Sequence, residues 1–260
     1  MDASRIVFLG DTHMMGTGAE WPHLWAHIPG VPLEFRKNMW INFVRNNLNN
    51  PRLINDKFRE ISSNLKFDID NDPVVLEYRE KGSWQAIVAK HYNLEYINLA
   101  FPAYNLYQIA AKLMVGQSYK DIFHTEDFSD CLVILGISDM SRDLLFHSTG
   151  ASNQLQNVSI PYIGITINLI KEFVEARGGK FTYFHVKDAP DHFYDFKLNP
   201  FFKVLNNFKL FDRSLYSFLT PTLENKTIDG MHYDVSVHKE LADKFIKEFE
   251  NSLIFSILMA

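Results

Sequence analysis

The sequence lacks several features that would place it in a specialised class of protein. It has a single cysteine, Cys131, among 260 residues, so no disulfide can form within the chain. No apolar stretch approaches the roughly 20 residues of a membrane-spanning helix. The formal net charge of −5 leaves no excess of lysine and arginine, which argues against a general nucleic-acid binder. With only 12 glycines and 10 prolines, the composition is neither collagen-like nor of low complexity.

The composition that remains is that of a folded protein. Hydrophobic residues make up 47% of the chain and charged residues 22%, which is typical of globular proteins. Aromatic residues reach 14%, with 22 phenylalanines, and this indicates a thick core or a broad apolar contact surface. Cys131 lies in an apolar run and is predicted to be a buried, inert thiol. The apolar tail Ser252–Ala260 is expected to be a helix end that packs on the core or on a neighbouring subunit.

Short apolar runs alternate with helical patterns along the chain. Four continuous apolar runs suit strands buried on both faces, and they are Ile6–Leu9, Tyr96–Leu99, Leu132–Leu135 and Phe181–Val186. The predicted helices are Ser83–Ala89 with Ser83 as its N-cap, Asn105–Val115, Asn157–Ala176 and a last helix, Val235–Phe249. This alternation predicts an α/β fold with a parallel sheet covered by helices on both sides. Since no repeat or linker divides the chain, we predict a single domain over residues 1–260.

Residues 19–82 interrupt the alternation after the first predicted strand. Helical patterns occur near residues 37–48 and 52–65. The aromatic residues of this insertion include Trp21, Trp25 and Trp40. An insertion at this point is expected over the carboxyl edge of the sheet, where open α/β sheets place their sites. It is predicted to be either a cap over the site or a contact surface for a partner, with tryptophans that form its core or stack on sugar rings.

Two polar motifs lie near opposite ends of the chain. Gly10–His13, which reads G-D-T-H, directly follows the first predicted strand, so its side chains are expected over the carboxyl edge of the sheet. Asp229–His232, which reads D-G-M-H, precedes the last helix. Its spacing lets the carboxylate hold one ring nitrogen while the other nitrogen acts as a base. A hydroxyl at Thr12 with this acid–imidazole pair is the layout of nucleophilic acyl transfer.

Two further strand ends carry polar groups. Asn98–Asn105, which reads N-L-A-F-P-A-Y-N, turns from the second strand into a helix, where backbone N–H groups are free to bind an anion. Gly136–Asp139, which reads G-I-S-D, follows the third strand and offers the hydroxyl of Ser138. Three successive strand ends and the final loop therefore aim polar groups at one edge of the sheet.

In this order the motifs resemble those of the SGNH hydrolases, also called GDSL-type esterases and lipases. That family has G-D-S after its first strand, a glycine turn after the second, G-x-N-D after the third and D-x-x-H before its last helix. Here Thr12 stands in place of the serine, Ala103 in place of the turn glycine and Ser138 in place of the asparagine, while Asp229 and His232 match. The resemblance covers most of the chain apart from the insertion.

The resemblance implies a flavodoxin-like three-layer α/β/α sandwich with a central parallel sheet. It also implies hydrolysis of esters, such as acetyl groups on carbohydrate or acyl chains of lipids. In that mechanism Thr12 attacks the acyl carbon, His232 takes its proton and Asp229 orients the imidazole.

The same resemblance assigns the groups that hold the developing oxyanion. These are the N–H groups of Thr12 and Ala103 and the hydroxyl of Ser138, with Asp11 and Asp139 beside them in the binding site. The three departures leave two predictions open. Losing one oxyanion donor costs about 10²–10³ in rate, so the chain is either an active hydrolase or a catalytically silent relative used for binding or assembly.

A metal-dependent phosphoesterase is a third, more remote alternative, because such enzymes also begin with aspartate and histidine after a first strand. The G-D-x-x-D and G-N-H-[ED] sequences that they need are absent, which leaves Asp139 and His185 as the further ligands. The acidic run Asp68–Asp72 lacks the glycine and terminal glutamate of an EF-hand and is predicted to be a solvated turn. His23 and His27 have no third ligand nearby. We predict no metal and no cofactor.

The expected partner is a small ester or an acylated glycan, without nucleic acid and without a membrane span. A homo-oligomer or a component of a larger particle would also suit the phenylalanine-rich composition and the apolar tail. The apolar run near the N-terminus is too short for a signal peptide, so we expect a cytoplasmic protein or one assembled into a particle.

Overall fold

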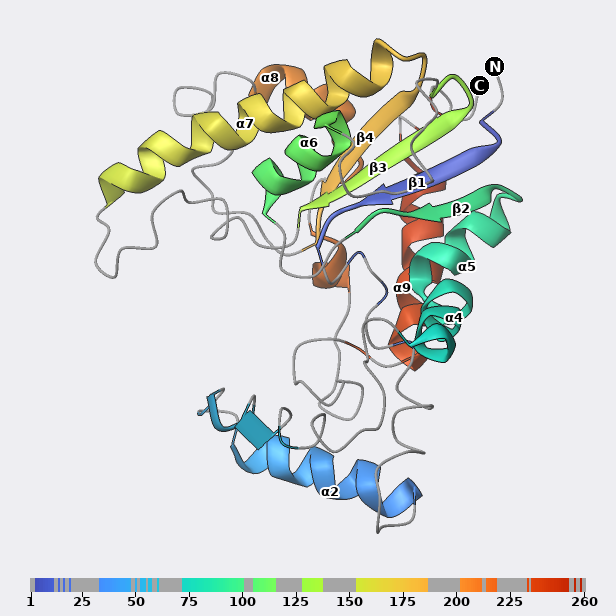
Figure 1. Ribbon diagram of the computed structural model, residues 1–260, viewed down its shortest axis with the longest axis vertical. Helices are drawn as coiled ribbons and strands as arrows, with labels where there is room; N and C mark the ends of the chain where they lie inside the picture. The colour runs from blue at the N-terminus through green and yellow to red at the C-terminus, as the bar shows by residue number, and fades with distance from the viewer. Residues whose placement is uncertain are drawn as a thin grey trace. The chain divides into compact units, whose positions relative to one another are not determined.

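In the computed structural model of the chain (Figure 1), the described residues are 3–11, 14, 16, 19, 33–47, 50, 52–54, 56–57, 60, 72–100, 105–115, 128–137, 153–186, 202–211, 214–218, 233, 235–252, 255 and 258. Contacts group the chain into two compact units. The first unit is Met1–Met15, Ala89–Phe218 and Lys244–Ala260, and the second is Gly16–Val88 and Leu219–Asp243. The insertion predicted over residues 19–82 falls within the second unit. The single-domain organisation stays a prediction.

The first unit is built on a parallel sheet. Its strands are β1 (Arg5–Leu9), β2 (Glu95–Asn98), β3 (Cys131–Ile137) and β4 (Lys180–His185), in the spatial order β2-β1-β3-β4. All three pairings are parallel, as the sequence predicted. An isolated parallel bridge between Tyr183 and Lys209 continues the order beyond β4. This is the strand order of flavodoxin-like folds, so the α/β class and the parallel sheet are confirmed.

All four strands were predicted from the sequence, but only some of the helices were. The structure has α2 (Leu33–Asn46), α4 (Pro73–Gly82), α5 (Trp84–His91), α6 (Leu106–Val115), α7 (Asn153–Glu175), α8 (Phe202–Leu205) and α9 (Val235–Glu250), with short 3-10 turns η3 (Asn206–Phe208) and η4 (Leu215–Phe218). The predictions for α5, α6, α7 and α9 are confirmed to within a few residues. The helix α4 was not predicted, nor were the short elements after β4. Since α2 and α4 lie between β1 and β2 in the sequence, the helical insertion after the first strand is confirmed.

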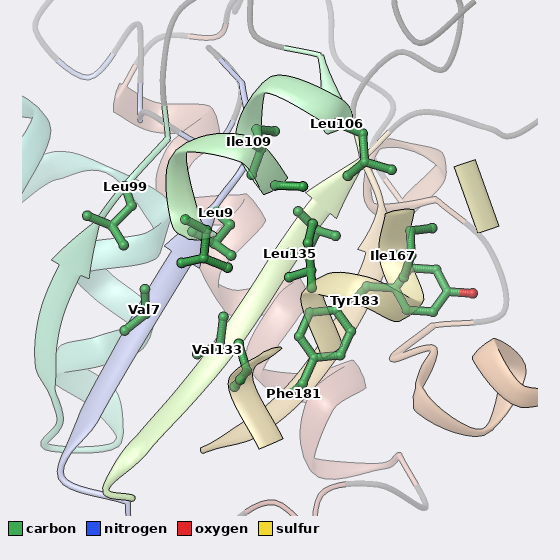
Figure 2. Close-up of a cluster of buried hydrophobic side chains, with 14 of the residues drawn as sticks. Val7, Leu9, Leu99, Leu106, Ile109, Val133, Leu135, Ile167, Phe181 and Tyr183 are labelled. Atoms are coloured by element: carbon green, nitrogen blue, oxygen red, sulfur yellow. The ribbon is translucent and has the colours of Figure 1, made fainter. Parts of the chain in front are cut away.

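One face of the sheet is covered by α6 and α7 (Figure 1). Alternate strand residues such as Val133, Leu135 and Phe181 point to this face, where they meet Ile109 of α6 and Ile167 of α7 (Figure 2). Their side chains are buried, and burial of each large apolar side chain stabilises the fold by roughly 1.5–3 kcal/mol. These contacts make the first helical layer.

The other face is covered by the C-terminal part of α9, residues 244–250. Phe245 packs edge-on against Phe184 of β4 at a centroid distance of 5.8 Å, and it also contacts Phe211 at 5.3 Å. Phe249 packs against Tyr92 at 5.6 Å. Because Phe184 alternates with Tyr183 along β4, the two residues face opposite layers. The sheet therefore lies between two helical layers, and the three-layer α/β/α arrangement is confirmed.

Side-chain caps explain several helix boundaries. The Asp72 carboxylate accepts hydrogen bonds from the amides of Val74 and Val75 at 2.9 and 3.1 Å, so α4 begins directly after it. Asp72 was predicted only as part of a solvated turn. Gly178, with φ of +82°, follows the end of α7 at the predicted stop.

The C-terminal tail packs on the first unit where it is described. Phe255 contacts Phe249 edge-on at 5.1 Å, and Leu258 is buried. The ammonium of Lys180 donates to the carbonyl of Leu258 at 3.0 Å. The predicted packing on the core is thus confirmed for these residues. None of the helices within the described part of the chain is long and apolar enough to cross a membrane.

Candidate functional site

The three strands that precede the predicted site motifs end side by side. Register pairs join Phe8 of β1 to Asn98 of β2, and Leu9 of β1 to Leu135 of β3. In a parallel sheet these carboxyl ends share one edge, which is where α/β folds bind ligands. The strand order therefore puts the starts of the three motifs next to one another, with the first motif in the middle.

Most of the predicted site residues lie outside the part of the chain that the structure describes. This applies to Thr12, Ala103, Ser138, Asp139, Asp229 and His232. It also applies to His13, His23, His27, Trp21 and Trp25. Their predicted roles stay predictions.

Asp11 is the one residue predicted for the hydrolase site that the structure describes. It is buried, and its backbone carbonyl accepts a hydrogen bond from the amide of Met14 at 2.9 Å. This bond closes a turn from residue 11 to residue 14, in which Thr12 is one of the two central residues. The turn is therefore held by a buried residue at each end, since Met14 is fully buried too.

The glycines of two motifs make room for Met14. A Cβ on Gly10 would lie 2.3 Å from Met14 Cγ and 2.9 Å from the carbonyl oxygen of Gly136. A Cβ on Gly136 would lie 2.2 Å from Met14 Sδ. Gly10 also has φ of +153°, which other residues rarely adopt. We call this arrangement the Met14 notch, and it explains both motif glycines by close packing across β1 and β3.

The sequence reasoning missed Met14. A methionine after a polar turn gives no signal of its own, because methionines fill gaps in many cores. The available signal was the pair of glycines at two neighbouring strand ends, which indicates a close approach of another group.

The end of β2 is shaped by Asn98. Its side-chain amide donates to the Tyr96 hydroxyl at 2.8 Å, and its side-chain oxygen accepts from the amide of Ala100 at 3.0 Å. The amide of Leu99 donates to the carbonyl of Phe8 at 2.9 Å, so the chain leaves β2 while still joined to β1. These bonds fix where the segment that contains Ala103 begins.

The start of α6 uses two of its own backbone amides. The side-chain oxygen of Asn105 accepts from the amide of Gln108 at 2.8 Å, and the Gln108 side chain accepts from the amide of Asn105 at 3.0 Å. This reciprocal pair is a capping box. The amide of Asn105 is therefore occupied, while Ala103, whose amide was expected to hold the oxyanion, lies outside the described residues.

The second unit contains a junction between α4 and α5 where two distant segments meet. A Cβ on Gly82 would lie 3.5 Å from Ala19 Cβ and 3.7 Å from Val235 Cγ2. Ala19 belongs to the segment that follows the Thr12 turn, and Val235 is the first residue of α9, shortly after His232. We call residues 82–84 the Gly82 junction.

Two more contacts hold the same junction. A Cβ on Gly16 would lie 2.3 Å from Ser83 Cβ, so the chain after the Thr12 turn passes close to Ser83. The amide of Trp84 donates to Nδ1 of the buried His238 at 3.2 Å. Since this bond needs a lone pair on Nδ1, the proton of the neutral ring lies on Nε2. The bond ties α9 to the start of α5.

His185 ends β4, next to Ile137 of β3. Burial, and to a smaller extent the positive charge of Lys209, lowers the pKa of its imidazole to about 3. The ring packs edge-on against Tyr183 at a centroid distance of 5.8 Å, which fits the predicted role as a core histidine. Within the described ranges, no three histidine, cysteine or acidic side chains form a group that could hold a metal ion.

No protein-family model matches the sequence, and no curated protein matches it. Several solved structures are similar to the chain at low identity. One is a protein from Desulfitobacterium hafniense DCB-2 assigned to the G-D-S-L lipolytic family, with a TM-score of 0.48 and 9% identity over 94% of this chain and 99% of that one. Another is LAE5, an α/β hydrolase from the metagenome of Lake Arreo in Spain, with a TM-score of 0.47 and 9% identity over 96% of this chain and 97% of that one.

A carbohydrate esterase, described as having divergent catalytic and non-catalytic binding functions in its active site, has a TM-score of 0.49 and 9% identity over 97% of this chain and 67% of its own. TM-scores and identities this low do not establish the family. The fold assignment rests instead on the strand order and on the two helical layers.

Proposed function

We propose that the protein is an ester hydrolase of the SGNH type that acts on an acylated carbohydrate or a similar small ester. Thr12 is the nucleophile, His232 the general base and Asp229 the residue that orients the imidazole. The motif with Thr12 follows β1, whose carboxyl end lies between those of β2 and β3, and the motif with Asp229 and His232 precedes α9.

One observation carries the proposal more than the others. Ala19 and Val235 both lie against Gly82, so the segments that follow Thr12 and His232 converge on one junction. Nothing in the sequence spacing requires segments so far apart to meet. Within the second unit, a segment that follows Thr12 in the sequence therefore lies beside one that follows His232.

The proposed reaction has two steps. Oγ1 of Thr12 bonds to the acyl carbon as its proton passes to His232, which then gives the proton to the departing alcohol. Water, deprotonated by His232, attacks the acyl-threonine and releases the acid and the free Thr12 hydroxyl. The N–H groups of Thr12 and Ala103 and the Ser138 hydroxyl hold the oxyanion in both steps.

Hydrolysis of p-nitrophenyl acetate tests the proposal. Thr12→Ala and His232→Ala should reduce turnover to the background rate, and Asp229→Asn should lower kcat by roughly 10⁴-fold because the imidazole loses its orientation. Asp130→Asn, at the other end of the sheet, is the matched control and should retain the wild-type rate. Circular dichroism of each variant checks that the fold is intact.

The outcomes separate the enzyme from a silent relative. Turnover that survives in Thr12→Ala would remove Thr12 as the nucleophile. A wild-type chain without turnover, combined with a Thr12→Ser variant that gains it, would identify a disabled member used for binding. Release of acetate from acetylated xylo-oligosaccharides, compared with cleavage of p-nitrophenyl decanoate, then distinguishes carbohydrate esters from lipid-like ones.

A further inference from the structure

The Met14 side chain joins two of the motifs that the proposed function uses. Its Cβ and Cγ lie against Gly10, and its Cγ, Sδ and Cε lie against Gly136. Gly10 begins the motif that contains Thr12, and Gly136 begins the motif that contains Ser138. One fully buried side chain thus spans the ends of β1 and β3.

We propose that Met14 is a positioning residue, which sets the distance between the Thr12 turn and the strand end that precedes Ser138. The catalytic consequence rests on the proposed function, but the positioning of the turn does not. Met14 touches no reacting group in this proposal and acts only through the turn it closes.

Met14 is held by its backbone amide and by its side chain. The amide of Met14 is bonded to the carbonyl of Asp11 at 2.9 Å, so Met14 is tied to the residue directly before Thr12. A Cβ on Gly10 would lie 2.3 Å from Met14 Cγ, and a Cβ on Gly136 would lie 2.2 Å from Met14 Sδ. The Met14 side chain thus occupies the space that a side chain at either glycine would need. Closely packed interiors do not absorb such shifts gradually. A displacement of about 1 Å at a reacting group lowers the rate by roughly 10²-fold.

Substitutions on both sides of the notch test the proposal. In Gly136→Ala the new methyl group would lie 2.2 Å from Met14 Sδ and 2.6 Å from Met14 Cγ, so the Met14 side chain must shift from its place in the notch. We expect kcat for p-nitrophenyl acetate to fall by about 10²-fold with little change in KM, since the turn orients the reacting group rather than binding substrate. Met14→Ala should lower kcat by a smaller factor, because the turn loses its anchor without a collision.

The double variant Met14→Ala/Gly136→Ala supplies the decisive comparison. The alanine methyl at 136 then occupies space that the methionine has vacated, so kcat should recover to within about tenfold of the wild type. The unfolding midpoints of the three variants are measured beside kcat, and a loss of kcat that appears only at temperatures where a variant begins to unfold would overturn the positioning role.

Gly179→Ala is the matched control for a steric collision elsewhere. Its new Cβ would lie 2.8 Å from Phe128 Cβ and 2.8 Å from Val174 Cγ1, just before β4 and at the amino end of the sheet. It should lower the unfolding midpoint in a comparable way while kcat stays at the wild-type value. Loss of kcat in Gly179→Ala equal to that in Gly136→Ala would mean that the effect is one of stability.

Amide hydrogen exchange separates this proposal from the proposed function. Faster exchange of the Met14 amide in Gly136→Ala and in Met14→Ala, restored in the double variant, supports positioning even if the wild-type chain has no esterase activity. Unchanged exchange and unchanged kcat in an active enzyme would overturn the positioning role and leave the proposed function intact. Unchanged exchange in an inactive chain would overturn both.

Discussion

The two ends of the parallel sheet differ in what joins β1 to β3. At the amino end, Arg5 Nε donates to the two carboxylate oxygens of Asp130 at 2.9 and 3.0 Å, and the hydroxyl of Ser4 donates to the same carboxylate. At the carboxyl end no such ionic pair joins the described residues of these strands. There Gly10 and Gly136 have no side chain, and the Met14 side chain fills the space next to both glycines.

This difference has a physical reason. Polar pairs at the amino end tolerate small displacements, because long side chains can follow one another and water is near. At the carboxyl end a Cβ on Gly10 would lie 2.9 Å from the backbone oxygen of Gly136, so an added methyl group there meets backbone as well as the Met14 side chain. The carboxyl end of the sheet is thus joined by packing of Met14 against two glycines, and the amino end by an ion pair.

The two ends also respond to acid in different ranges of pH. The Arg5 guanidinium and the Ser4 hydroxyl lower the pKa of Asp130 to about 2. At the carboxyl end, burial lowers the pKa of His185 to about 3, far below the ordinary value of 6.5. Acid therefore begins to act through His185 at a pH where the ion pair of Asp130 is still complete.

The largest expected effect comes from Gly10→Ala. The new Cβ meets Met14 and the backbone of Gly136, and φ of +153° is unfavourable for alanine. An overpacking cost of ~1–3 kcal/mol and a backbone cost of ~1–3 kcal/mol should together lower the free energy of unfolding by roughly 3 kcal/mol or more. Urea denaturation followed by circular dichroism measures this loss.

Gly178→Ala is the matched control at the amino end of the sheet. Its φ of +82° is also left-handed, but the nearest atom to the new Cβ is 3.1 Å away, at Ser129 Cα. The cost should be about 1–2 kcal/mol, close to the conformational penalty alone. Equal losses for the two alanine variants would contradict the claim that the carboxyl end is the more tightly packed.

The next effect concerns acid and His185. Below pH 6.5 the unfolded chain binds a proton that the buried ring binds only near pH 3, so stability present above pH 6.5 is lost as the pH falls through this range. The loss should reach about 1.4 kcal/mol per pH unit. His185→Leu should remove this slope, apart from any constant change in stability. Unfolding free energies at several pH values measure it, and an unchanged slope would show that the ring ionises in the folded protein.

The smallest effect is expected for Asp130→Asn. The Asp130 side chain is 36% exposed, so solvent screening limits the pair to about 1 kcal/mol or less at neutral pH. Because the folded pKa is depressed, this contribution is complete above pH 3.8 and disappears as the pH falls towards 2. Titration of the Asp130 carboxyl group by NMR tests this pH range. The urea midpoints of the wild-type protein and of Asp130→Asn are measured at the same pH values. A midpoint difference that persists unchanged to the lowest pH would assign the effect to something other than charge.

The sequence predicted the elements whose signals are local. The runs around Val7, Val133 and Phe181 are continuous and apolar, and such runs form strands in almost any arrangement of a parallel sheet. Ser83 and Asn105 were recognisable as helix starts because a capping side chain acts on amides only a few residues away.

The sequence predictions failed where neighbouring residues favour different secondary structures. The helix α4 was not predicted because Val74 and Val75 are β-branched, and β-branched residues favour strands. Asp72-Pro73 nevertheless forms a common start of a helix. The capping box that Gln108 completes with Asn105 at the start of α6 was not predicted. That pairing was visible in the spacing of the two residues.

The sequence by itself determined the strands, the main helices and the order of the polar motifs, because periodicity and capping act over a few residues. Only the tertiary structure decided that β1 lies between β2 and β3, that Met14 enters the space above Gly10 and Gly136, and that Ala19 and Val235 meet on Gly82. These contacts join segments far apart in the chain, and their formation depends on how whole surfaces fit together. No local pattern of residues encodes such a fit.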